Sequence, residues 1–316
     1  MESIPEGAEL IPNAYAKNFN LYRLLDSSYL ITTNSAKGGE GGYYKIPSAG
    51  FSNLPVYMSC PSAMSLWASA ADSKDKLSGI KNIKFTSTKK EDWHLDYVLK
   101  SFENKNLEYI GKYSSPDFEE LLTAQVALAV ESTMITHAPK IKEKLEALGI
   151  VVFVDKSSYE ESPLARLEWI KVYGILQGKF EEACRFFNEE EKKILSIKTS
   201  SEGKGKNLAF FSVNMNGTVM FRQRGDYIDK MIGDAGASCL FPETKKNQSA
   251  FTNISFESFY LLARDADYLI YNGSINSPLK SLDELLEKNN MFKDFKAVKN
   301  KCVWRVGPSF YQATDQ

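Results

Sequence analysis

The chain has 316 residues, of which 43% are hydrophobic and 25% are charged, and its formal net charge is −1. This length suits two domains of ordinary size, and the near-neutral charge offers neither a basic surface for nucleic acid nor a polybasic membrane patch. No apolar run in the sequence is long enough for a transmembrane helix.

Histidine and cysteine are too sparse for most catalytic and metal sites. His94 and His137 are the only histidines, and the four cysteines are isolated from one another. We therefore expect no Ser-His-Asp triad, no resident metal ion and no cofactor, and we predict that the protein is not an enzyme. The alternative is an enzyme that uses Cys60 or Glu160. We expect buried free thiols rather than disulfides.

Residues 1–50 are predicted to form an N-terminal extension of short strands, such as 29–33. From residue 51 the pattern alternates between strand and helix. Strands are expected at 56–59, 126–130 and 150–154, with a helix at 138–148 among those between them. Continuous apolar strands that alternate with helices favour a parallel sheet covered on both faces, so we predict an α/β lobe over residues 51–178.

A helix is expected at 164–177, and a longer charged amphipathic helix occupies 179–200. Twenty helical residues span about 30 Å, which is enough to bridge two lobes. A second α/β alternation follows over 201–316, beginning with the apolar run 208–213. The sequence therefore predicts two α/β lobes joined by one helix.

Each predicted lobe carries a glutamate at the start of a short helix that leads into an apolar strand. Glu119 lies before the strand 126–130, and Glu257 lies before the strand 267–273. Two exposed carboxylates far apart would suit a two-point docking surface. The alternative is that each glutamate only complements the dipole of its own helix.

Ligands of parallel sheets bind where the strands end, and this rule selects candidate residues in both lobes. The candidates combine aromatic rings with arginine, which suits a large, flat or anionic ligand. Trp67 has a helical core position as its alternative, and a solvated hairpin is the alternative for both candidate arginines of the second lobe. The predicted ligand-binding residues are Tyr57, Trp67, Trp93, Tyr159, Arg166, Arg222, Arg224 and Tyr311.

Several blocks of the sequence resemble the substrate-binding proteins of ABC importers for iron complexes and vitamin B12. The most specific block is Glu161-Ser-Pro-Leu-Ala-Arg-Leu-Glu-Trp-Ile-Lys171. The others are residues 115–122, 145–155, 227–236 and 255–257. The resemblance is dispersed over about residues 50–316, in the order and spacing of the family.

This resemblance implies the class III periplasmic binding protein fold, in which two Rossmann-like lobes are bridged by a single long α-helix. It implies an extracytoplasmic monomer, in the periplasm or lipid-anchored on the outer face of the membrane. Such a protein captures a metal chelate and delivers it to an ABC permease. Glu119 and Glu257 match the family's permease-docking glutamates.

The identity of the ligand stays open at this point. A ferric siderophore is the first expectation, and a corrinoid or haem is the alternative; haem would want an axial ligand such as Tyr57 or His94. A ligand sensor that kept the fold without transport is a further alternative. Because one bridging helix is stiff, we expect only a small lobe closure on binding.

Overall fold

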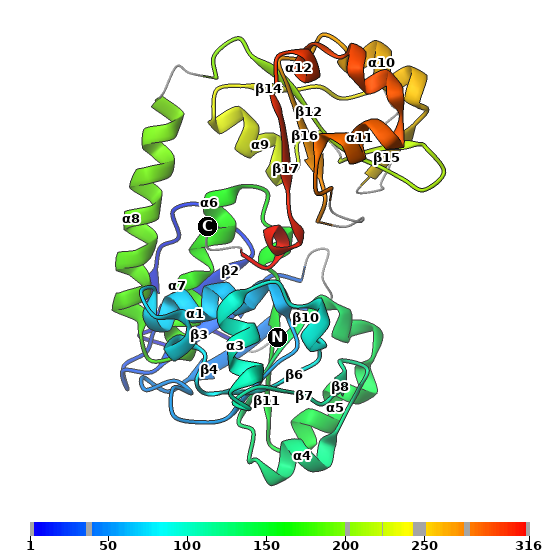
Figure 1. Ribbon diagram of the computed structural model, residues 1–316. Coiled ribbons are helices and arrows are strands. Elements are labelled where there is room, and N and C mark those ends of the chain that lie inside the picture. Colours follow the sequence, from blue (N-terminus) through cyan, green and yellow to red (C-terminus); the bar gives the residue numbers. More distant parts are fainter. Residues whose placement is uncertain are drawn as a thin grey trace. The chain divides into compact units, whose positions relative to one another are not determined.

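A computed structural model of the protein describes residues 3–35, 40–199, 203–222, 224–242, 251–274 and 279–313 (Figure 1). By their contacts these residues form two compact units. The first comprises residues 1–160, 164–191 and 312–316, and the second comprises residues 161–163 and 192–311. Residues 201 and 202, the predicted start of the second lobe, lie outside the described residues.

The first unit begins with an antiparallel sheet of four strands in the order β1-β2-β3-β4. Its strands are β1 (Glu9–Ile11), β2 (Phe19–Arg23), β3 (Tyr29–Thr33) and β4 (Gly42–Ile46). Leu21 of β2 and Leu30 and Ile31 of β3 are fully buried. The predicted N-terminal extension is therefore packed into the first unit rather than standing apart from it.

The second sheet of this unit has five parallel strands in the order β11-β10-β5-β6-β7. These strands are β5 (Val56–Met58), β6 (Ile83–Thr86), β7 (Glu108–Tyr109), β10 (Leu128–Ser132) and β11 (Val151–Asp155). A short ribbon, β8 (Gly111–Lys112) with β9 (Ser115–Pro116), follows β7. The helices between these strands are α1 (Met64–Asp72), α2 (Lys76–Gly79), α3 (Asp96–Glu103), α4 (Phe118–Thr123) and α5 (Pro139–Ala147).

After β11 the chain forms α6 (Pro163–Glu168) and α7 (Ile170–Leu176), which divide the single helix predicted at 164–177. The next helix, α8 (Phe180–Thr199), is the long helix predicted at 179–200. The division between the two units falls within α8, after Glu191, so this helix carries the chain from one unit into the other.

Two buried carboxylates hold the segment between β1 and β2. Glu168 accepts hydrogen bonds from the backbone N–H groups of residues 14–16 at 2.7–2.8 Å. Glu160 accepts them from residues 17 and 18 at 2.9–3.1 Å, and also from the indole Nε1 of Trp169. Since buried charge is tolerated only when its hydrogen-bonding capacity is met, these contacts join the N-terminal sheet to the α6–α7 region.

The second unit has a mixed sheet in the order β15-β13-β12-β16-β17, with β14 paired to β12. Its strands are β12 (Asn207–Val213), β13 (Val219–Arg222), β14 (Ser238–Cys239), β15 (Phe251–Ile254), β16 (Tyr268–Asn272) and β17 (Val303–Val306). Strands β14, β12, β16 and β17 run parallel, whereas β13 is antiparallel to β12. Its helices are α9 (Tyr227–Asp234), α10 (Phe256–Ala263), α11 (Leu282–Lys288) and α12 (Lys296–Lys299).

The core of the second unit is rich in phenylalanine. Phe259 of α10 packs against Phe211 of β12 with ring centroids 4.6 Å apart, and Phe292 and Phe295 complete the cluster. Each unit is thus an α/β lobe with its own hydrophobic core, and one long helix connects the two lobes. This is the predicted fold class.

Candidate ligand-binding site

Three of the predicted aromatic ligand contacts lie in the core of the first lobe instead. Tyr57 and Trp67 are completely buried, and Trp93 is 2% exposed with its Nε1 donating to the carbonyl of Thr88 at 3.2 Å. Tyr57 belongs to the cluster beneath α4 and α5, and Trp67 lies 6.3 Å from Tyr173, centroid to centroid. Rings that expose almost no surface cannot contact a ligand in this conformation. For the same reason the Tyr57 phenol could not serve as an axial ligand to haem.

The turn after β11 presents one predicted aromatic ring and anchors one predicted arginine. Tyr159 is 37% exposed, and its hydroxyl lies 3.3 Å from the Thr133 hydroxyl, which follows β10. Arg166 donates to the backbone carbonyls of Glu160 and Ser158 at 3.1 and 2.6 Å. The Tyr159 ring is therefore available at the carboxyl end of the sheet, while the Arg166 guanidinium holds the turn that carries it.

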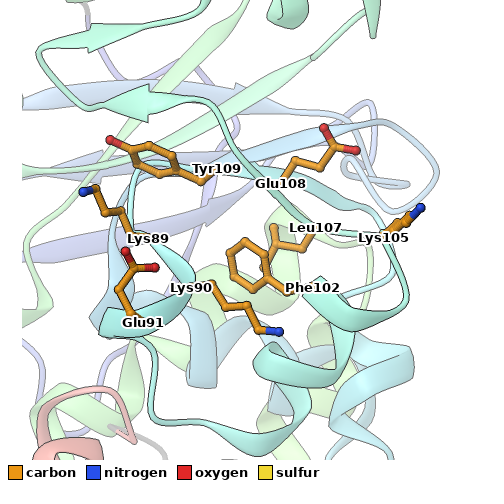
Figure 2. Close-up of a pocket in the computed structure, with 8 residues that line it drawn as sticks. All are labelled: Lys89, Lys90, Glu91, Phe102, Lys105, Leu107, Glu108 and Tyr109. Atoms are coloured by element: carbon orange, nitrogen blue, oxygen red, sulfur yellow. The ribbon is translucent and has the colours of Figure 1, made fainter.

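A cavity of about 520 Å³ lies at the β7 edge of the same sheet, between the loop that follows β6 and the segment that leads into β7. Its walls come from the η2 segment (Lys90–Asp92) and the residue before it, from the end of α3, and from β7. Figure 2 shows Phe102 and Leu107 in the middle of the cavity, with Lys89 and Tyr109 on one side and Lys105 on the other. The lining residues are Lys89, Lys90, Glu91, Phe102, Lys105, Leu107, Glu108 and Tyr109.

The cavity has an apolar floor and a charged rim. Leu107 is 1% exposed, Phe102 is half-buried and Tyr109 is exposed. Of the three rim lysines, Lys90 lies 3.7 Å from Glu103, and no ion pair of Lys89 or Lys105 occurs among the described residues. Sequence reasoning missed this site because its candidate in the loop was Trp93, whose ring turns inward, and it did not consider the adjacent lysines.

In the second lobe, the candidates Arg222 and Tyr311 lie together. Arg222 Nη1 donates to the Tyr311 hydroxyl at 2.8 Å, and its Nε donates to the Asp226 carboxylate. Asp226 also caps α9, accepting the N–H groups of residues 228 and 229 at 3.0 Å. Arg222 is half-buried and paired, so it is not part of a solvated hairpin.

Arg224 has a different environment from Arg222. It lies exposed in the turn before α9, and its guanidinium carbon is 4.9 Å from the centroid of the Phe241 ring. A cation against an aromatic face of this kind leaves its N–H donors directed to solvent, where they could meet an anionic ligand. Arg224 is the candidate arginine that is most accessible in this lobe.

Glu119 and Glu257 both lie exposed in the first turn of a helix. Asp117 caps α4 by accepting the N–H groups of residues 119 and 120, and Ser255 caps α10 by accepting that of Ser258. Because other side chains already cap both helices, neither glutamate is needed as the cap. No ion-pair partner of either glutamate occurs among the residues that the structure describes.

Each of these helices also exposes a leucine about one turn after its glutamate. Leu122 is 58% exposed and Leu261 is 72% exposed, at spacings of three and four residues that share a helix face. The neighbouring Leu121 is completely buried. The two lobes thus repeat one arrangement, an exposed carboxylate beside an exposed apolar side chain.

Other groups suited to catalysis are buried or occupied. The Cys60 thiol is buried, which raises its pKa, and Glu160 is held by backbone N–H groups as described above. All four cysteines are free. Within the described ranges, no three His, Cys, Asp or Glu side chains gather to form a metal site, and no helix there combines the length and apolarity that a membrane span requires.

Comparison with known proteins gives one family for most of the chain. The sequence profile of the family described as periplasmic binding protein matches residues 67–309. An uncharacterised lipoprotein of Methanocaldococcus jannaschii is 24% identical over 280 residues, which are 88% of this chain and 64% of the lipoprotein. The chain therefore spans less than two thirds of the length of this relative.

Solved structures share the fold at low sequence identity. A periplasmic binding protein of Veillonella parvula has a TM-score of 0.65 at 15% identity, covering 91% of this chain and 95% of its own. The periplasmic catecholate-siderophore binding protein of Vibrio cholerae has a TM-score of 0.63 at 16% identity, covering 87% and 94%. At these identities the likeness establishes the architecture and not the ligand.

Proposed function

The chain belongs to the periplasmic binding protein family, and on this premise we propose that it captures a metal chelate outside the cytoplasm and delivers it to an ABC import permease. A ferric siderophore is the proposed ligand, with a corrinoid or haem as the alternative. The cavity of about 520 Å³ beside the edge strand β7 of the first lobe carries this proposal. Its volume lies within the range of about 300–1,000 Å³ that is usual for small-molecule sites.

The chemistry of both lobes supports a ligand with an organic shell and negative charge. Phe102, Leu107 and Tyr109 offer apolar and aromatic surface, and the lysines around them offer positive charge. The second lobe separately exposes Arg224, a cation with several donors. A bare metal ion would need a cluster of anionic or imidazole ligands, and the cavity does not offer one.

Glu119 and Glu257 are the proposed contacts with the permease. Both carboxylates are exposed on helices that another side chain caps, and each has an exposed leucine beside it, which a dipole-complementing glutamate does not require. Exposed ion pairs contribute only about 0–1 kcal/mol, so the glutamates should set orientation and association rate. We propose that Leu122 and Leu261 add apolar contact to the same surfaces.

We propose an extracytoplasmic location, either free in the periplasm or lipid-anchored on the outer face of the membrane. The family and the lipoprotein description of the Methanocaldococcus jannaschii relative support this. The protein is proposed to act as a monomer in complex with the permease.

Calorimetric titration of the purified protein with a ferric siderophore, haemin and cyanocobalamin tests the ligand proposal. We expect saturable 1:1 binding of one class. Absence of heat and of tryptophan quenching with all three would overturn it. A protein that binds a chelate but associates with no import permease would instead be a ligand sensor on the same fold.

A further inference from the structure

We propose that Asn216, in the turn between β12 and β13, is a site of N-linked glycosylation. The acceptor sequence for this modification is Asn-x-Ser/Thr, in which x is not proline, and Asn216-Gly217-Thr218 has that form. The proposal rests on the extracytoplasmic location proposed above, because the sugar is transferred outside the cytoplasm. It adds a modification that neither chelate capture nor permease docking requires.

The chain contains four such triplets, and the structure separates them by exposure. They begin at Asn216, Asn247, Asn253 and Asn272. Asn247 lies outside the described residues. Asn272 is the last residue of β16 and is only 2% exposed, so an enzyme could not reach its amide in the folded lobe. Asn216 and Asn253 are both exposed.

Asn253 is exposed but is held within the sheet. It lies inside β15, and its side-chain oxygen Oδ1 accepts a hydrogen bond from Asn214 Nδ2 at 2.9 Å. The hydroxyl of its triplet belongs to Ser255, which caps α10 by accepting the N–H of Ser258 at 3.2 Å. Since the transferring enzyme requires the hydroxyl of the third residue, this triplet is poorly presented. Asn216 is therefore the acceptor that the structure favours.

The turn that carries Asn216 has a defined shape. Asn214 N donates to the Thr218 carbonyl at 2.9 Å, and Gly217 N donates to the Asn214 carbonyl at 3.0 Å. Gly217 has a φ of 78°, a left-handed conformation that glycine adopts without strain and that short hairpin turns use. Residues 215–217 are all exposed, so the turn presents Asn216 at its tip.

The first and third residues of the triplet are already in contact within this turn. Asn216 Oδ1 accepts hydrogen bonds from the backbone N–H of Thr218 at 3.1 Å and from its hydroxyl at 2.7 Å. These bonds occupy the amide oxygen of Asn216. The amide nitrogen Nδ2, which would carry the sugar, donates to no partner in the described part of the chain.

The transfer uses a lipid-linked oligosaccharide as its donor. A bond forms between Asn216 Nδ2 and the anomeric carbon of the sugar, while the bond from that carbon to the phosphate oxygen of the lipid carrier breaks. One amide proton leaves Nδ2, and the lipid phosphate departs as the leaving group. The attached sugar would cover Met215, whose side chain is fully exposed beside it.

The test uses the protein as its own organism exports it. Protease treatment of intact cells identifies the exported protein, and mass spectrometry of its tryptic fragments locates any sugar. Cleavage after lysine and arginine places Asn216 in the fragment 207–222, which contains no other triplet. The remaining triplets fall in the fragments 247–264 and 265–280, so each modification is assigned without ambiguity.

Four variants accompany the wild type. Asn216→Gln removes the acceptor nitrogen, and Thr218→Val removes the hydroxyl while keeping the branched shape of the side chain. Thr218→Ser retains the hydroxyl and is the matched control, and Asn253→Gln tests the other exposed triplet. Circular dichroism checks that each variant is folded.

We expect the fragment 207–222 of the exported wild type to carry a sugar, and Asn216→Gln and Thr218→Val to lose the added mass completely. Thr218→Ser and Asn253→Gln should keep it. An exported protein whose fragment 207–222 is unmodified overturns the inference and leaves chelate capture intact, and so does sugar found only in the other fragments. A protein that stays inside the cytoplasm overturns the proposed location as well.

Discussion

The carboxylate of Glu168 accepts the backbone N–H of Tyr15 at 2.7 Å, across 153 residues of sequence. The same carboxylate also binds Lys171 at 2.7 Å and has no exposed side-chain surface. It therefore fastens the loop between β1 and β2 to the α6–α7 region of the first lobe.

Replacing Glu168 by glutamine should destabilise the protein by roughly 3 kcal/mol. The amide retains one acceptor oxygen but loses the charge that balances Lys171, and it adds donors beside backbone N–H groups that already need acceptors. Urea unfolding monitored by circular dichroism measures the change. Glu143→Gln, at an exposed position on α5, is the control, and equal stability of the two variants would contradict this account.

Glu131 should make stability depend on pH. Its side chain lies on β10 with no hydrogen-bond partner for either carboxylate oxygen among the described residues, and burial raises its pKa from 4.5 to about 8, although the nearby Ser59 hydroxyl opposes the rise. Because the folded pKa is the higher one, the folded state holds a proton that the unfolded state has released. The stabilisation that comes from this retained proton is fully present below pH 4.5 and is lost as the pH rises to about 8.

Melting temperatures measured from pH 5 to pH 9 test this dependence, with Glu131→Gln for comparison. The glutamine variant cannot ionise, so its stability should fall less than that of the wild type over this range. The neighbouring groups Tyr57 and Cys60 have pKa values raised by burial and stay neutral there. Parallel pH profiles for the two proteins would show that Glu131 is not the group responsible.

Removing both proposed docking carboxylates should slow association with the proposed permease partner. We expect Glu119→Gln/Glu257→Gln to reduce the association rate about tenfold at low salt, and to lose most of that effect at high salt where exposed charges are screened. The measurement is surface plasmon resonance with the permease in lipid nanodiscs. Glu143→Gln/Glu287→Gln is a control with an equal change of charge. Identical association kinetics for the two double variants would indicate that Glu119 and Glu257 only complement the dipoles of their own helices.

The alternation of strands and helices could be predicted because buried parallel strands are continuous apolar runs. The predicted strand 150–154 corresponds to the parallel strand β11, and the predicted helix 179–200 is α8. The positions of Glu119 and Glu257 in first helical turns also followed from local sequence. These features depend on neighbouring residues, and local patterns report them well.

The direction of individual side chains was less predictable because it depends on sheet register and long-range packing. Tyr57 and Trp93 follow the rule that ligands bind at strand ends, yet both face inward. The role of Glu168 required contacts with residues more than 150 positions away. The lysine cavity is formed by residues 89–109, and it required the packing of α3 and β7 beside η2, which residue patterns do not report.

The most direct test of the central claim is calorimetric titration of the wild-type protein with ferric enterobactin. The account predicts saturable binding of one chelate per protein chain, with an affinity that falls as salt increases. Absence of saturable binding by this chelate and by ferrichrome, haemin and cyanocobalamin under the same conditions would contradict the assignment of the protein to metal-chelate capture.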